Sequence, residues 1–287
     1  MPIKLAHTSR LQELPILEIG ASLWDEERYA AFKACYGVMR AIDDIADQHK
    51  KNCEHLTAIE RQKIIITMQN VFTNARQKNP VYGRALADYN IPGWIWTEWM
   101  QAMIYDLYHN KFATWEDFLA YSEGAAVIPG ALFILLAVNG TECRLQLSSR
   151  KILALSRPLA LFSYIVHILR DFRADVKNGF NYFVDDILQK YEIAPDCLSK
   201  AAGQPFLPVN LVACIDEYLR RADAYRRQAK QKLYLLPEGS VLFKSMTIVF
   251  ILYEQLFFNI NTHKNTLSKN KILLPGSYIA QLVRDNI

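Results

Sequence analysis

Two pairs of aspartates in this chain have the spacing of a metal site. Asp43 and Asp47 are four residues apart, as are Asp171 and Asp175, and both pairs lie in long helix-forming stretches. This spacing places the two carboxylates of each pair one turn apart on one face of a helix. Because like charges repel at that distance, we expect a cation between them. Mg²⁺ is the natural candidate, since it takes oxygen ligands, keeps several waters and usually bridges to substrate phosphates.

An apolar stripe at helical spacing leads into each pair of acids: Phe32, Tyr36 and Met39 into the first, and Leu161, Tyr164 and Ile168 into the second. Such stripes face the core of a helical protein, so the acids are expected to point inward, towards a cavity. Buried carboxylates without partners would cost roughly several kcal/mol each, which metal and phosphate would compensate. The alternative is that the pairs mark helix ends, with acids that are solvated or bonded to Arg40, Arg170 and Arg173.

Composition favours one large globular protein. The chain has 287 residues, of which 51% are hydrophobic and 22% charged, with a net charge of +4. A basic run at residues 220–232 is interrupted by Asp223 and Tyr225, as in a solvated helix face; weak attraction to anionic lipid is the alternative. Because zinc-finger spacing, RNA-stacking motifs and a basic tail are absent from the sequence, we expect no nucleic-acid partner.

The cysteines and the apolar segments bear on the location of the protein. Five scattered cysteines without CxxC spacing indicate reduced thiols rather than disulfides or a zinc site. The first residues lack the apolar core of a signal peptide. The longest uncharged apolar run, residues 125–138, has 14 residues and contains Pro129 and Gly130, so we expect no transmembrane segment. The expected location is the cytoplasm, with peripheral contact at the inner membrane as an open alternative.

Helical periodicity extends over nearly the whole chain. Helices are predicted at residues 24–48, 57–78, 94–108, 118–138, 146–176, 209–234, 240–261 and 277–283. Alternating strand patterns are scarce, and the sequence contains no GxGxxG or glycine-rich phosphate loop. We therefore predict a single all-α domain, residues 1–287, with a site between facing helices.

Several motifs together resemble those of the squalene/phytoene synthase family, the head-to-head isoprenyl diphosphate synthases. Residues 28–47 are similar to the first aspartate motif of that family with its arginine, and residues 167–182 to the second motif and its Gly-x-x-Tyr extension. Residues 121–130 resemble the tyrosine-led kinked helix beside the substrate cavity. Residues 225–237, Tyr253 and residues 271–275 resemble the C-terminal segments of the family.

The resemblance implies a helical bundle of the isoprenoid-synthase type with a central cavity. It implies two or three Mg²⁺ ions that bind together with diphosphate and are held by Asp43, Asp47, Asp171 and Asp175. The implied substrates are farnesyl or geranylgeranyl diphosphate, condensed head-to-head to a squalene, phytoene or presqualene diphosphate type of product. The implied diphosphate-binding residues are Arg28, Arg40, Arg170, Tyr253 and Lys271, the catalytic residues include Tyr121, and the cavity residues are Tyr36, Ala126 and Tyr164.

Departures from the family pattern leave alternatives open. His167 stands where the family usually has asparagine; it would orient Asp171, act as a base, or simply pack. Glu123, two residues after Tyr121, stands where the family often has an aromatic or basic residue. It would be a base or acceptor anchor in the cavity, or a surface acid. Lys271 stands where the family commonly has an arginine. The aromatic residues of the stripes would stabilise a carbocation or be ordinary core residues.

Two other functions are therefore kept. One is transfer of a single prenyl group to a non-isoprenoid acceptor such as an aromatic ring, with Glu123 or His167 taking the proton. The other is a non-catalytic relative that acts as a binding or assembly protein, against which the intact acids of both motifs argue.

Overall fold

The structure, a computed structural model, describes residues 11, 13–139, 148–267 and 269–286. These residues form helices and no strand, so the predicted all-α class is confirmed. The α-helices are α1 (Ile16–Ala21), α2 (Glu26–Lys50), α3 (Ala58–Lys78), α4 (Pro80–Asp88), α5 (Gly93–Tyr105), α6 (Trp115–Ser122), α7 (Ile128–Val138), α8 (Ser149–Asn178), α9 (Asp185–Lys190), α10 (Pro195–Gly203), α11 (Val209–Leu233), α12 (Val241–His263), α13 (Lys269–Ile272) and α14 (Gly276–Asp285).

The predicted long helices are present, and several short ones were missed. Helix α4 begins at Pro80, directly after the helix predicted at 57–78, and the Asn79 side chain caps it by accepting hydrogen bonds from the backbone N–H groups of Val81 and Tyr82. The short helices α1, α9, α10 and α13 were not predicted, since so few turns carry too little periodicity to be recognised. The start of the helix predicted at 146–176 falls partly on residues 146 and 147, which lie outside the described residues.

The two helices that carry the acids are among the longest in the described residues. The carboxylate of Asp25 caps α2 by accepting a hydrogen bond from the backbone N–H of Arg28. Ser148 caps α8 in the same way. Gly179 ends α8 with φ of 85°, a left-handed conformation that glycine adopts at little cost. These caps define helices of 25 and 30 residues.

The segment from α6 to α7 is continuous but changes its winding. Thr114 and Asp117 form a reciprocal capping box at the start of α6. A π-helical turn, Glu123–Val127, then joins α6 to α7. Such turns are often found at functional sites, because they rotate the side chains that follow. Almost every residue of α7 is buried.

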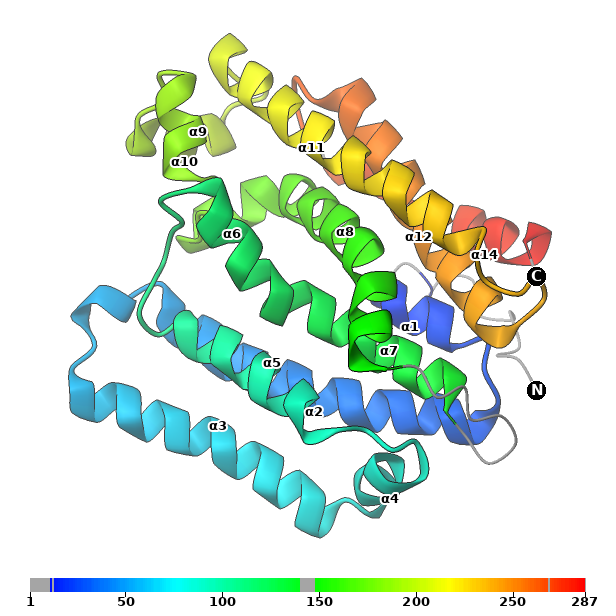
Figure 1. Ribbon diagram of the computed structural model, residues 1–287. Helices are drawn as coiled ribbons and strands as arrows, with labels where there is room; N and C mark the ends of the chain where they lie inside the picture. The colour runs from blue at the N-terminus through cyan, green and yellow to red at the C-terminus, as the bar shows by residue number, and fades with distance from the viewer. Residues whose placement is uncertain (1–10, 12, 140–147, 268, 287) are drawn as a thin grey trace.

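The helices stack in layers, with the long acid-bearing helices in the middle (Figure 1). Helix α3 packs on α2, and α2 also contacts α5 and α7. Helix α8 packs against α7 on one side and against α11 and α12 on the other. The buried side chains of all these layers form one hydrophobic cluster. The acids of α2 and α8 therefore face the interior from neighbouring layers.

Three helical segments are long and apolar enough to cross a membrane, judged by length and composition: Trp115–Val138, Ser149–Asn178 and Val241–His263. In the most apolar stretch of each, 72%, 56% and 50% of the residues are buried inside the fold. The expectation from sequence considered only the uncharged apolar run of 14 residues. In the structure this run, with Pro129 and Gly130, is part of a longer continuous helical segment. Segment length by itself thus does not support the expectation that no membrane-spanning segment exists.

Candidate active site

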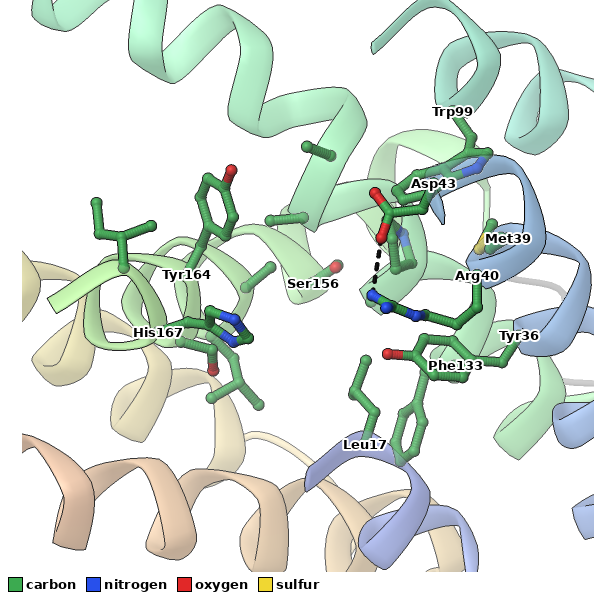
Figure 2. Close-up of a pocket in the computed structure, with 18 of the residues that line it drawn as sticks. Leu17, Tyr36, Met39, Arg40, Asp43, Trp99, Phe133, Ser156, Tyr164 and His167 are labelled. Atoms are coloured by element: carbon green, nitrogen blue, oxygen red, sulfur yellow. Dashed lines mark hydrogen bonds and ion pairs between the residues drawn. The ribbon is translucent and has the colours of Figure 1, made fainter. Parts of the chain in front are cut away.

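A cavity of about 370 Å³ lies between α2, α5, the α6–α7 segment, α8 and α12. Helix α2 contributes four of the predicted site residues to its wall: Tyr36, Arg40, Asp43 and Asp47. The other helices contribute six more: Tyr121, Ala126, Tyr164, His167, Asp175 and Tyr253. Figure 2 shows Arg40 and Asp43 of α2 on one side of the cavity and Tyr164 and His167 of α8 on the other. The two motifs therefore face each other across a shared space.

The cavity changes from polar to apolar along the axis of α2. Phe133 of α7, which lines the cavity, packs edge-on against Phe32 near the start of α2, with ring centroids 6.0 Å apart. Asp43 and Asp47 lie three and four turns further along the same helix face. The walls near Phe133 continue with apolar residues of α12, Met246 and Val249. A ligand with an anionic head and a hydrocarbon chain fits this division.

The first acid pair carries negative charge that the protein compensates only in part. The guanidinium Nη1 of Arg40 donates to Asp43 at 2.7 Å and Nη2 donates to Asp44 at 3.1 Å. Burial, and next the charge of Asp47, still raise the pKa of Asp43 to about 7. Burial also raises the pKa of Asp47, partly offset by Lys50. Elevated pKa values in both acids indicate a site that lacks positive charge.

The second acid pair is arranged differently. Asp171 accepts hydrogen bonds from Arg170 Nη2 at 2.6 Å and Nε at 3.1 Å, and its carboxylate lies 3.0 Å from Nε2 of His167. Burial would raise the pKa of Asp171, but these partners outweigh it and hold the pKa well below its usual range. Asp175, one turn later, lines the cavity, whereas Asp171 does not. The second motif thus presents one acid to the cavity and neutralises the other with its own residues.

These carboxylates fit a Mg²⁺ ion whose coordination is completed by substrate and water, rather than one surrounded by protein ligands alone. Among the described residues, no group of three or more His, Cys, Asp or Glu side chains is gathered around one metal position. Mg²⁺ is commonly held by one or two carboxylates, with water and substrate phosphates completing its coordination. Asp43 and Asp47 from α2 and Asp175 from α8 are the cavity-lining carboxylates that suit such an arrangement.

His167 occupies a position between the cavity and the second motif. Its side chain is 46% exposed and lines the cavity, while its imidazole lies within bonding distance of Asp171 and of Arg170 Nη2. Of the three roles foreseen for it, simple packing in the core is inconsistent with this exposure. Orienting Asp171 and accepting a proton from the cavity are both compatible with the geometry.

Besides Asp171 and its partner Arg170, three predicted residues do not line the cavity. Glu123 is paired at the surface with Arg157 of α8, and its side chain is 42% exposed. This placement corrects the expectation that Glu123 reaches the cavity, because the π-helical turn that begins at this residue changes which side chains face inward. Arg28 is bonded to Asp25 at 2.9 Å beside the start of α2, and Lys271 is exposed on α13. Neither lines the cavity, so their predicted contact with diphosphate is not supported.

The sequence interpretation missed a charged cluster behind the polar end of the cavity. Lys50, at the last turn of α2, forms an ion pair of 2.7 Å with Asp106, and both side chains are almost fully buried. Asp106 also accepts a hydrogen bond of 2.8 Å from the hydroxyl of Tyr121. One signal was available, because Lys50 follows Asp43 and Asp47 at positions i+7 and i+3 on the same helix face.

Comparison with known proteins identifies the family. The sequence model of squalene/phytoene synthases matches residues 19–271, so the chain belongs to the squalene/phytoene synthase family, as the motifs predicted. At the level of the family this supports a prenyltransferase that joins isoprenoid units. A comparison with curated proteins gives no match.

Solved structures share the fold at low sequence identity. A dehydrosqualene synthase crystallised with a ligand superposes with a TM-score of 0.74 at 15% identity, covering 98% of this chain and 94% of that one. Squalene synthase HpnC from Alicyclobacillus acidocaldarius gives 0.69 at 17% identity, covering 91% and 94%. YisP from Bacillus subtilis gives 0.61 at 13% identity, covering 98% and 95%. These similarities establish the isoprenoid-synthase type of helical bundle that the motifs implied.

Proposed function

We propose that this protein is a Mg²⁺-dependent prenyltransferase that condenses two allylic isoprenyl diphosphates head-to-head, to a product of the squalene, phytoene or presqualene diphosphate type. The substrates we propose are farnesyl or geranylgeranyl diphosphate. One observation carries the proposal: carboxylates from two facing helices line the same cavity, and that cavity continues into a wall of apolar side chains. Family membership agrees with this assignment.

The residues at the polar end are suited to the diphosphate. Asp43, Asp47 and Asp175 would hold Mg²⁺, with Asp171 as a ligand that must first leave its Arg170 and His167 partners. When bound, the metal stabilises the leaving pyrophosphate as a Lewis acid. Arg40 is half-exposed, so its guanidinium can turn from Asp44 to a phosphate oxygen while it retains Asp43.

The residues of the apolar wall are suited to the prenyl chain and to a carbocation. Heterolysis of the C–O bond leaves an allylic cation and pyrophosphate. The C2–C3 double bond of the second substrate then attacks the cation, and loss of one proton gives a cyclopropylcarbinyl diphosphate. Tyr36 and Tyr164 present aromatic rings to the cavity, where a cation–π contact is worth about 2 kcal/mol if it is desolvated. His167 is the cavity-lining imidazole available to accept the proton.

Transfer to a non-isoprenoid acceptor has less support. That alternative rested on Glu123 and His167 as residues that would anchor or deprotonate the acceptor. Glu123 lies outside the cavity in an ion pair with Arg157, so one of its two motivations is removed. A purely binding role has no specific observation in its favour, because both acid motifs are intact.

The decisive experiment incubates the purified protein with farnesyl or geranylgeranyl diphosphate and Mg²⁺. Pyrophosphate release is followed over time, and the organic extract is examined by mass spectrometry. A product containing two prenyl chains supports the proposal. Release of pyrophosphate with only a single-chain alcohol would contradict head-to-head condensation, and prenylation of an aromatic acceptor without any two-chain product would favour the alternative.

A further inference from the structure

Lys50 is a buried cation immediately behind the wall of the proposed active site. It is 2% exposed and does not itself line the cavity. Its Nζ lies 2.7 Å from Oδ1 of Asp106, a residue that is 1% exposed and follows the last turn of α5. A lysine and an aspartate from helices far apart in sequence are thus enclosed together beside Asp47, one turn before Lys50 on the same face of α2.

Three tyrosines that line the cavity surround this ion pair. The Nζ of Lys50 lies 4.5 Å from the ring centroid of Tyr182 and 5.1 Å from that of Tyr121. The ring of Tyr164 bridges the other two, with centroids 6.4 Å from each. The aromatic rings therefore separate the ammonium group from the cavity, so Lys50 can influence a ligand in the cavity through these tyrosines.

The ion pair gives the two flanking tyrosines opposite hydrogen-bonding roles. The hydroxyl of Tyr121 donates to Oδ2 of Asp106 at 2.8 Å, so its oxygen keeps lone pairs for the cavity. The ammonium of Lys50 donates to the hydroxyl oxygen of Tyr182 at 3.5 Å, and an ammonium group cannot accept a hydrogen bond in return. The hydroxyl proton of Tyr182 is consequently left for another acceptor.

We propose that Lys50 is a positioning residue that, together with Asp106, orients Tyr182 as a hydrogen-bond donor to the leaving diphosphate and Tyr121 as an acceptor within the cavity. This inference rests on the proposed function. A well-packed apolar pair could fill the same volume without loss of stability in many proteins. The role of the ion pair is then to fix the hydrogen-bonding direction of Tyr121 and Tyr182, two side chains that line the cavity.

The test replaces the ion pair by apolar residues of similar size, in the double variant Lys50→Met/Asp106→Leu. Removing both charges leaves neither partner of the pair as an unpaired buried ion, so the variant should melt within a few degrees of wild type. We expect kcat to fall about 10-fold or more while KM changes less than about 3-fold, as for loss of a donor used in the transition state. The matched control is Lys200→Met/Asp196→Leu, which removes an exposed ion pair of the same 2.7 Å length and should leave kcat unchanged.

Tyr182→Phe, made in both backgrounds, separates positioning from a merely structural role. In the wild-type background it should lower kcat about 10-fold, and in the Lys50→Met/Asp106→Leu background less than about 2-fold, because the oriented donor is already lost. Equal reductions in both backgrounds, or wild-type kcat in the folded apolar variant, would overturn the assignment.

Binding of inorganic pyrophosphate with Mg²⁺, measured by calorimetry, provides a readout that needs no turnover. Wild type should bind it more tightly than the apolar variant does, since Tyr182 no longer donates there. If wild type binds pyrophosphate and turns over, but neither affinity nor kcat changes in the variant, the role of Lys50 is refuted and the proposed function stands. If wild type neither binds pyrophosphate nor forms a prenyl product, the proposed function fails and the role of Lys50 fails with it.

Discussion

Asp43→Asn should stabilise the metal-free protein at neutral and alkaline pH while it abolishes turnover. The pKa of Asp43 is raised from an ordinary value of 3.8 to about 7, first by burial and then by the charge of Asp47. A group whose pKa is raised on folding favours the folded state at low pH, and this contribution is lost as pH rises through the folded-state pKa. Above pH 7 the wild-type protein therefore carries a charged, incompletely paired carboxylate that the asparagine variant lacks.

The size of the effect follows from the pKa difference. About three pKa units correspond to roughly 4 kcal/mol of unfolding free energy, at about 1.36 kcal/mol per unit. The Asp43 side chain is 20% exposed, and its ion pair with the half-exposed Arg40 is also lost. Solvent screening and that loss reduce the expected gain to about 1–3 kcal/mol. For a protein of this size the melting temperature should rise by about 2–10 °C.

The assay is thermal unfolding of the metal-free wild type and of Asp43→Asn at pH 5 and pH 8. We expect a clear stabilisation by the substitution at pH 8 and one less than half as large at pH 5, where Asp43 is protonated in the folded wild type but ionised in the unfolded chain. Asp44→Asn is the matched control, because Asp44 bonds to the same arginine at 3.1 Å but is 59% exposed. A variant that melts below wild type at pH 8, or that shifts equally at both pH values, would refute the electrostatic account of the first motif.

Asp171→Asn should act in the opposite direction, since the pKa of Asp171 is held low by His167 and Arg170. We expect its unfolding free energy to fall by roughly 1–3 kcal/mol at pH 7, with the difference from wild type shrinking as pH drops below about 4; stabilisation at pH 7 would contradict this. Calorimetry should show that Mg²⁺ binds weakly alone and more tightly with a non-hydrolysable prenyl diphosphate, because each neutralises the other; equal affinity with and without the analogue would argue against bridging. Glu123→Gln should keep kcat within about 2-fold of wild type, since the ion pair of Glu123 with Arg157 is at the surface. Near-complete loss of turnover would show instead that Glu123 takes part in the reaction.

The site was predictable from sequence wherever it depends on one helix at a time. Helical periodicity is local, so the stripe from Phe32 to Asp43 already showed that the first acid pair would face inward. The same reasoning placed Tyr164 and Asp175 at the cavity, and the motif spacing led to the family that the whole-chain comparison identifies. Each of these conclusions needs only the geometry of a regular helix.

The tertiary structure decided what depends on interrupted periodicity or on contacts between distant segments. The π-helical turn at Glu123 breaks the 3.6-residue repeat, so the orientation of this side chain could not be extrapolated from Tyr121. Asp171 is turned from the cavity to its own neighbours by side-chain hydrogen bonds that spacing does not specify. The pairing of Lys50 with Asp106 joins the end of α2 to the end of α5, and only the packing of these helices brings the two charges together. Local sequence thus determined which helix faces carry the acids, whereas long-range packing determined which of them line the cavity and which are turned to partners outside it.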